Sequence, residues 1–174
     1  MNEPVVIEAV TVESLPGIRD YLAELLRETV NSGDTVGFLP PISAEEAAAY
    51  WNGVRQVLGG GGRRLLIARR ADRVVGTVQL DLAQQTNGHH RAEVMKLLVD
   101  RGARRLGLGR RLMEAVEGVA RNERRTLLVL DTRQGEPSEG FYAALGYERV
   151  GVIPNFAESA DGTLHTTVLF YKEL

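Results

Sequence analysis

The segment from residue 91 to residue 131 constrains the fold most, because it alternates from strand to helix to strand. The apolar run RAEVMKLLVD predicts a strand over 91–100. After a basic loop that contains glycines, apolar residues at helical spacing predict a helix from Leu108 to Val119. The nearly all-apolar run 126–131 predicts a second strand. Because a helical crossover joins parallel strands, we predict an α/β fold with at least one parallel pair.

The rest of the chain predicts strands that pair mostly antiparallel. The short connection Ala71-Asp72 predicts a hairpin, and Ser43 followed by Glu46 predicts a capping box. We expect about seven strands in a mixed sheet with helices on both faces, and, at roughly 150 residues per domain, one domain over 1–174. The remaining predicted elements are strands at 5–12, 64–70, 73–82, 147–153 and 164–171, helices at 15–30, 43–58 and 136–145, and loops at 31–42 and 154–162.

Composition excludes several classes of function. The chain has no cysteine, which excludes a disulfide scaffold, a thiol nucleophile and a cysteine zinc site. His89-His90 lacks zinc-site spacing, so we expect no metal. The 21 basic and 23 acidic residues give a net charge of −2, so we expect neither nucleic acid nor membrane as a partner. No apolar run approaches the ~20 residues of a membrane span and no signal peptide is visible, which predicts a soluble cytoplasmic protein.

The loop Arg104-Arg105-Leu106-Gly107-Leu108-Gly109 lies between the predicted strand and helix, where unpaired N–H groups and the helix dipole favour an anion. Arginines nearby suit phosphate oxygens, so a ligand with a pyrophosphate fits; the alternative is a solvated loop with ordinary turn chemistry. A dinucleotide-binding loop needs a third glycine where Leu112 stands. The glycines at 59–62 lack a following Lys-Ser or Lys-Thr and predict a helix-to-strand connection instead of a phosphate loop.

Two motifs carry a family resemblance. The spacing Arg104-x-x-Gly107-x-Gly109 and the later Phe141-Tyr142-x-x-Leu145-Gly146-Tyr147 resemble two segments of the GNAT superfamily of acetyltransferases. The stretches VGF, NGHHRAEVMKLLV, RRLGLGRRLMEAVE, LDT and DGTLHTT are similar to the tabtoxin-resistance type. The resemblance implies acetyl-CoA as cosubstrate, a splayed parallel pair, a small-molecule acceptor, a role in antibiotic or toxin resistance, and a monomer or homodimer.

The same resemblance implies which residues bind acetyl-CoA. The pantetheine arm pairs with main chain at the end of the first strand, and the pyrophosphate lies on the glycine loop. Many family members have an asparagine seven residues before the tyrosine, where this chain has Gly135, so one cofactor contact differs. The implied cofactor residues are Leu97, Leu98, Val99, Arg104, Arg105, Leu106, Gly107, Leu108, Gly109 and Arg110.

Three residues are candidates for catalysis. Tyr142 matches the family position that protonates the leaving thiolate; the alternative is core packing. Glu93 matches a general base; the alternative for it is a salt bridge with Arg91 or Lys96. Strand alternation puts Glu93 on one face with Met95, Leu97 and Val99, apart from any bulge. Asp131 ends the second strand and orients the acceptor, takes its proton or caps a loop.

The acceptor pocket is expected between the first two helices and the last hairpin. Without a cysteine for an acyl-enzyme, we predict direct attack of an amine or hydroxyl on the thioester. The alternatives are a non-catalytic acyl-CoA-sensing module and an acetyltransferase for protein N-termini or lysines. Candidate acceptor residues are Asp34, Phe38, Trp51, Asn87, Asn155 and His165.

Overall fold

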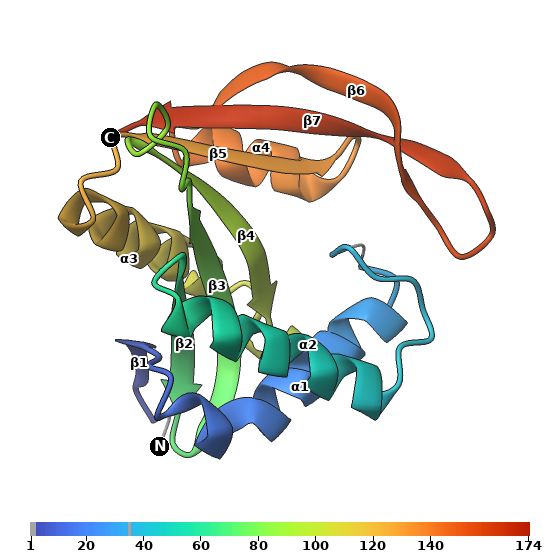
Figure 1. Cartoon of the computed structure of the whole chain (residues 1–174). Coiled ribbons are helices and arrows are strands. Elements are labelled where there is room, and N and C mark those ends of the chain that lie inside the picture. The colour runs from blue at the N-terminus through green and yellow to red at the C-terminus, as the bar shows by residue number, and fades with distance from the viewer. Residues whose placement is uncertain (1–2, 35) are drawn as a thin grey trace.

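The computed structural model describes residues 3–34 and 36–174. Seven strands form one sheet in the order β1-β2-β3-β4-β5-β7-β6. Within the described residues, β4 and β5 are the one parallel pair, which confirms the predicted mixed α/β fold (Figure 1). The strands are β1 (Val5–Ala9), β2 (Arg63–Arg70), β3 (Arg73–Leu82), β4 (Arg91–Val99), β5 (Leu127–Arg133), β6 (Glu148–Glu158) and β7 (Leu164–Glu173).

Helices cover both faces of the sheet, as the sequence predicts. The helices α1 (Leu15–Asn31) and α2 (Ala44–Gly59) lie side by side on one face of the first four strands (Figure 1). The helix α3 (Leu108–Asn122) crosses the opposite face and joins β4 to β5. The short helix α4 (Pro137–Ala144) lies against β5. This arrangement makes β4 and β5 the centre of the molecule.

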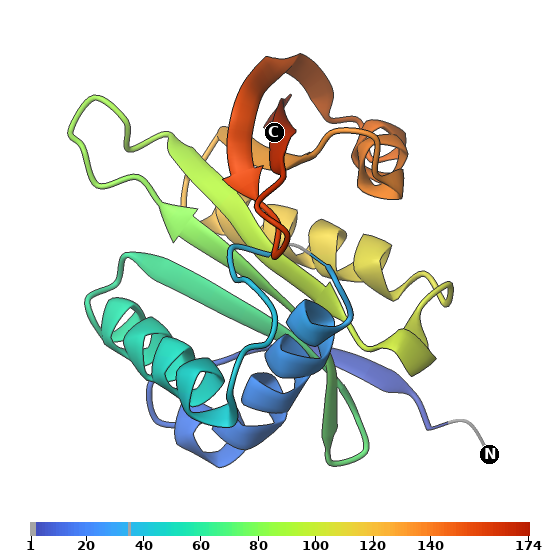
Figure 2. The same ribbon diagram turned by 90° about the vertical axis from the view of Figure 1, so that its right-hand side faces the viewer.

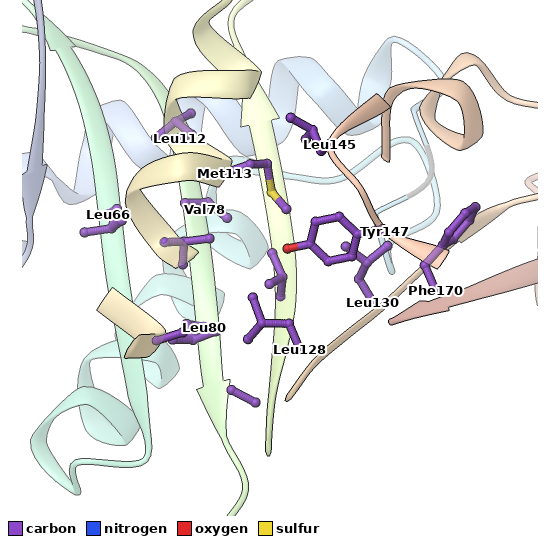
Figure 3. Packing of buried hydrophobic residues seen from close by; sticks show 14 of the residues in the cluster. Leu66, Val78, Leu80, Leu112, Met113, Leu128, Leu130, Leu145, Tyr147 and Phe170 are labelled. Carbon is purple, nitrogen blue, oxygen red and sulfur yellow. The ribbon is translucent and has the colours of Figure 1, made fainter. Parts of the chain in front are cut away.

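Each face of the sheet has its own hydrophobic core. On the α3 face, one cluster spans the sheet from β2 to β7, and Figure 3 shows Met113 of α3 near Leu130 and Tyr147. On the α1 and α2 face, the cluster contains Trp51 and Leu22 and reaches no further along the chain than Leu98 of β4 among the described residues. The α3 core therefore joins the two halves of the sheet, while no described residue of β5 belongs to the core on the α1 and α2 face.

Local signals in the sequence act as expected at the start of α2 and at the first hairpin. The Ser43 side chain accepts from the Glu46 N–H at 3.1 Å and Glu46 accepts from the Ser43 N–H at 2.9 Å, which confirms the capping box. Arg70 pairs with Arg73 across the β2–β3 turn. The glycines at 59–62 end α2 and lead directly into β2, as predicted.

The C-terminal hairpin differs from the prediction. We predicted a loop over 154–162, but β6 continues to Glu158. The strand passes Pro154 with a register irregularity between Ile153 and Ala157, where Asn155 has a φ of 54°. β6 is an edge strand, so the missing N–H of the proline costs no ladder bond on its open side. The long hairpin extends toward the loop between α1 and α2 (Figures 1 and 2).

Candidate functional site

The parallel strands β4 and β5 diverge soon after they begin. Their pairing consists of three residue pairs, from Arg91 with Leu127 to Glu93 with Val129. Beyond these pairs, β4 continues to pair with β3, and β5 continues to pair with β7. The facing backbone edges of 94–99 and 130–133 therefore have N–H and C=O groups available to an extended ligand inserted between them. The predicted pantetheine residues Leu97, Leu98 and Val99 lie along this edge.

A β-bulge interrupts β4 within the diverging part. Thr77 pairs with Leu98 and Gln79 pairs with Met95, so Lys96 and Leu97 share one partner position on β3. Lys96 has a φ of 52°, the left-handed region that bulges use. Leu98 consequently packs into the α1 and α2 core, whereas Leu97 packs against the α3 core. Glu93 and Met95 therefore follow the predicted alternation, and the bulge, for which that prediction made an exception, moves Leu97 and Val99 to the α3 face because it inserts one residue.

The start of α3 has the features of an anion site. Its N-cap is Gly107, with a φ of 73° and no side chain to cap the first N–H groups. A Cβ added at Gly109 would lie 3.3 Å from Cζ of Phe141, so glycine lets α4 pack against this helix end. Leu106 is exposed, while Leu108 is buried in the core and anchors the helix. The main chain at 104–110 can thus hold a pyrophosphate through its N–H groups, with the helix dipole in support.

The arginines of this loop also hold the connection between α1 and α2. Arg104 forms an ion pair of 2.5 Å with Asp34 and donates to the Val99 carbonyl at 3.3 Å. Arg101 donates to the Ser32 carbonyl at 3.3 Å. Asp34, which we predicted as an acceptor residue, thus lies next to the cofactor loop. An ion pair thus joins the predicted cofactor loop to a predicted acceptor residue.

Tyr142 lies on α4, in the turn that packs on the start of α3 through Phe141. Its ring centroid is 5.2 Å from Phe141, 6.0 Å from Tyr147 and 6.1 Å from Phe170. Burial, with a contribution from the negative charge of Asp131, raises the pKa of Tyr142 to about 12. The hydroxyl therefore keeps its proton at neutral pH, on the side of the molecule where β5 separates from β4.

The two predicted carboxylates lie on the two diverging strands. Asp131 accepts from the Thr167 hydroxyl at 2.6 Å, which orients the carboxylate. Partial burial, followed by the negative charges of Asp131 and Asp81, raises the pKa of Glu93; the positive charges of Arg63 and Lys96 oppose this. A carboxylate with a raised pKa is a better match to general-base work near neutral pH than an ordinary one.

A polar network that sequence reasoning missed lies beside Glu93. Gln79 is fully buried in β3 and accepts from Arg63 at 3.1 Å, and its amide donates to the Tyr50 hydroxyl at 3.0 Å. Arg63 also forms an ion pair of 2.8 Å with Asp81. The one available signal was a glutamine inside the apolar strand RVVGTVQLDL, since a buried amide requires partners.

The other predicted acceptor residues are widely distributed. Phe38 packs edge-on against Tyr50, with ring centroids 5.3 Å apart. Trp51 is fully buried behind Tyr50, 5.1 Å between centroids, so it supports that ring from the core. His165 of β7 contacts the Arg133 guanidinium at 2.9 Å, near the end of β5.

The two predicted asparagines of the acceptor site are both exposed. Asn155 is exposed on the edge strand β6. Asn87 is exposed in the turn before β4, at the end where β4 and β5 still pair, so the fold does not bring it to the divergence.

Across residues 3–34 and 36–174, we find no group of three potential metal-ligating side chains. Nor does any helix of that part have the length and hydrophobicity to span a membrane.

Residues 26–147 match the family model described as Acetyltransferase (GNAT) family. The chain belongs to the GNAT acetyltransferase family. The matched range includes the cofactor loop, both carboxylates and Tyr142, so the predicted family is confirmed. As a member, the chain is an acetyl-CoA-dependent acyltransferase, and the diverging strands and the uncapped start of α3 fit that cosubstrate.

Solved GNAT structures share the fold across nearly the whole chain. A ribosomal-protein-alanine N-acetyltransferase from Brucella melitensis is 21% identical, with a TM-score of 0.76 over 97% of this chain and 99% of that one. The yncA protein of Salmonella typhimurium, solved with its cofactor acetyl-CoA, is 16% identical, with a TM-score of 0.76 over 98% and 94%. An aminoglycoside 6'-acetyltransferase type Ii is 23% identical, with a TM-score of 0.74 over 97% and 96%.

Proposed function

We propose that the chain, as a single domain over 1–174, transfers the acetyl group of acetyl-CoA to an amine or hydroxyl of a small molecule by direct attack. One observation supports this proposal: Glu93 is the last residue of β4 that pairs with β5, Asp131 follows two residues after its partner Val129, and Asp131 is near enough to Tyr142 to raise the pKa of that hydroxyl. An extended thioester between the strands brings its carbonyl within reach of these groups. An acceptor on the open face of β5 then meets the thioester.

In the proposed mode of binding, main chain at 97–99 pairs with the pantetheine arm and main chain at 104–110 holds the pyrophosphate. A backbone N–H near the bulge stabilises the oxyanion that forms on the thioester carbonyl. The bulge supports this role, because the extra residue turns main-chain groups out of the β3 ladder.

For an amine acceptor, each of the three side chains has a role in the proposed proton and charge movements. Asp131 holds the ammonium, and Glu93 takes one proton from it, directly or through water. The free amine attacks the carbonyl carbon; the new C–N bond forms, the C–S bond breaks, and the nitrogen loses its second proton to solvent. Tyr142 donates a hydrogen bond to the departing thiolate, which takes up a proton from solvent to become the thiol, and Glu93 returns its proton to solvent.

We propose a small acceptor instead of a protein chain, because side-chain contacts hold the connection between α1 and α2 in place beside the site. The two ends of this connection are joined by Asn31, whose amide oxygen accepts a hydrogen bond from the Ile42 N–H at 2.9 Å. Arg104 and Lys96 hold it at Asp34 and at the Val36 carbonyl. We further propose a cytoplasmic enzyme, monomeric or homodimeric, that protects against an amine-containing antibiotic or toxin. The second candidate is acetylation of protein N-termini, in line with the name of the Brucella relative.

Release of the coenzyme A thiol in the presence of an acceptor panel tests the proposal. The panel contains amino acids, simple amines, an aminoglycoside, a β-lactam toxin and a peptide with a free N-terminal alanine. Thiol release with a small acceptor and formation of its acetylated product support the proposal. Turnover of the peptide alone would transfer the assignment to protein N-termini. Binding of acetyl-CoA without transfer to any acceptor would leave a sensing module.

A further inference from the structure

Lys96 places a positive charge beside the catalytic carboxylates, and the mechanism above does not use it. It lies on the bulge of β4, beyond the last residue that pairs with β5. Its side chain is half-buried. Burial of an ammonium group costs free energy unless a ligand or a protein group compensates for it. The ammonium thus needs a partner.

The Lys96 ammonium is held at one point by the loop between α1 and α2. It donates to the Val36 carbonyl at 2.6 Å and lies 5.6 Å and 5.9 Å from the ring centroids of Phe38 and Tyr50. Gly37 has a φ of 84°, a conformation that favours glycine, and a Cβ added there would lie 3.0 Å from Nζ, so the loop passes close to the ammonium. The position of the charge is thus set by one carbonyl, two aromatic rings and a glycine of the loop.

The surroundings of Lys96 favour an anion. An ammonium has three N–H donors, and in the described part of the chain one of them is used, by Val36. The ion pairs formed by the described residues do not include Lys96, although Glu93 and Asp131 are near enough to influence it. Burial, and then the positive charge of Arg63, lower the pKa of Lys96, while the two carboxylates oppose this. Bound carboxylate would satisfy the remaining donors and offset the burial.

We propose that Lys96 binds an anionic group of the acceptor, so that the acceptor is a small amine that also carries a carboxylate. This inference rests on the proposed function, because the amine must lie between Glu93 and Asp131 to react. Opposite charges then meet at two points: Glu93 and Asp131 lie against the ammonium of the acceptor, and Lys96 lies against the carboxylate of the acceptor. The rings of Phe38 and Tyr50 form an apolar wall for the rest of the acceptor. A polycationic acceptor would meet Lys96 and Arg63 as like charges.

Matched pairs of acceptors test this proposal in the full-length protein. L-methionine is compared with 3-(methylthio)propylamine, and L-phenylalanine with 2-phenylethylamine, so each pair differs only in the carboxylate. We expect kcat/KM to favour the amino acid by roughly 10- to 150-fold, the range for one charge-assisted hydrogen bond. Lys96→Gln keeps a donor for the Val36 carbonyl and removes the charge. It should abolish the preference by lowering kcat/KM for the amino acids alone.

Two control variants separate anion binding from loop positioning. Lys96→Arg keeps the charge and should retain a preference for the amino acid. Phe38→Leu disturbs the loop without changing the charge and should affect both members of each pair equally. Equal kcat/KM values in the wild type, or an equal loss for both members in Lys96→Gln, would overturn the inference and leave the proposed function intact.

Binding measurements keep the inference testable without turnover. N-acetyl-L-phenylalanine should raise the melting temperature of the wild-type protein, and N-acetyl-2-phenylethylamine should raise it less. Lys96→Gln should remove that difference. If no acceptor is acetylated but this carboxylate-dependent shift appears, the anion site stands and the proposed activity fails. The absence of any difference between the two N-acetyl compounds would refute the anion site.

Discussion

Replacing Tyr142 by phenylalanine removes one oxygen atom and leaves the ring contacts with Phe141, Tyr147 and Phe170 in place. Burial raises the pKa of Tyr142 to about 12, whereas a thiol has a pKa of about 8.5. Complete transfer of the proton to the thiolate would thus be uphill by about 5 kcal/mol. The hydroxyl therefore acts mainly as a hydrogen-bond donor to the sulfur, which is worth about 1.5–3 kcal/mol. We expect Tyr142→Phe to lower kcat by roughly 10- to 150-fold.

Tyr147 provides a matched control for this prediction. Its hydroxyl is buried and has no hydrogen-bond partner among residues 3–34 and 36–174, and the ring lies in the core beside Leu130 (Figure 3). Tyr147→Phe should leave kcat unchanged, and neither substitution should weaken acetyl-CoA binding more than a few-fold. Steady-state thiol release and isothermal titration with acetyl-CoA measure these values. Equal kcat values for the wild type and Tyr142→Phe, or equal losses in the two variants, would refute the hydrogen-bond role and return Tyr142 to a packing role.

Three further predictions concern the cofactor loop and the pH profile. Gly107→Asp should weaken acetyl-CoA binding roughly 10- to 100-fold more than Gly107→Asn, because both side chains tolerate the left-handed conformation and only the first carries a charge that repels phosphate; equal Kd values would place the phosphates elsewhere. Asp131→Asn should shift the acidic limb of kcat/KM to lower pH, since Asp131 raises the pKa of Glu93 and the base is active when deprotonated; an unmoved limb would mean that Glu93 is not the base. Because Tyr142 remains protonated up to about pH 12, its titration should not affect activity below pH 10. Any decline of activity with rising pH below pH 10 should therefore persist in Tyr142→Phe. A decline that disappears in this variant would contradict the burial of Tyr142.

The features that the sequence predicts well are local. The capping box at Ser43 depends on residues three apart, and the start of α3 depends on two glycines within one loop. Hydrophobic spacing likewise identifies α1 and α3, since a helix buries one stripe and its period is short. The family motifs point to Glu93 and Tyr142 from short segments, and the roles of these two residues stay predictions.

The features that the sequence does not predict depend on contacts between distant segments. Tyr50 and Gln79 meet because α2 packs over β2, which pairs with β3, and nothing in either segment alone indicates the other. The ion pair between Arg104 and Asp34 joins a cofactor loop to a connection 70 residues earlier. The end of β6 was also missed, because a proline in an edge strand gives the same local signal as a proline in a loop.

The bulge at Lys96 explains why these distant groups converge. One extra residue turns Leu98 into the α1 and α2 core, which binds the end of β4 to those helices and away from β5. The same residue aims its ammonium at the connection 32–42, whose Val36 carbonyl receives it. Arg104, a few residues further along, holds that connection again at Asp34. A single insertion in one strand thus contributes to the course of β4 beyond Glu93, to the position of the connection between α1 and α2 and, in the proposed mode of binding, to the charge that binds the acceptor.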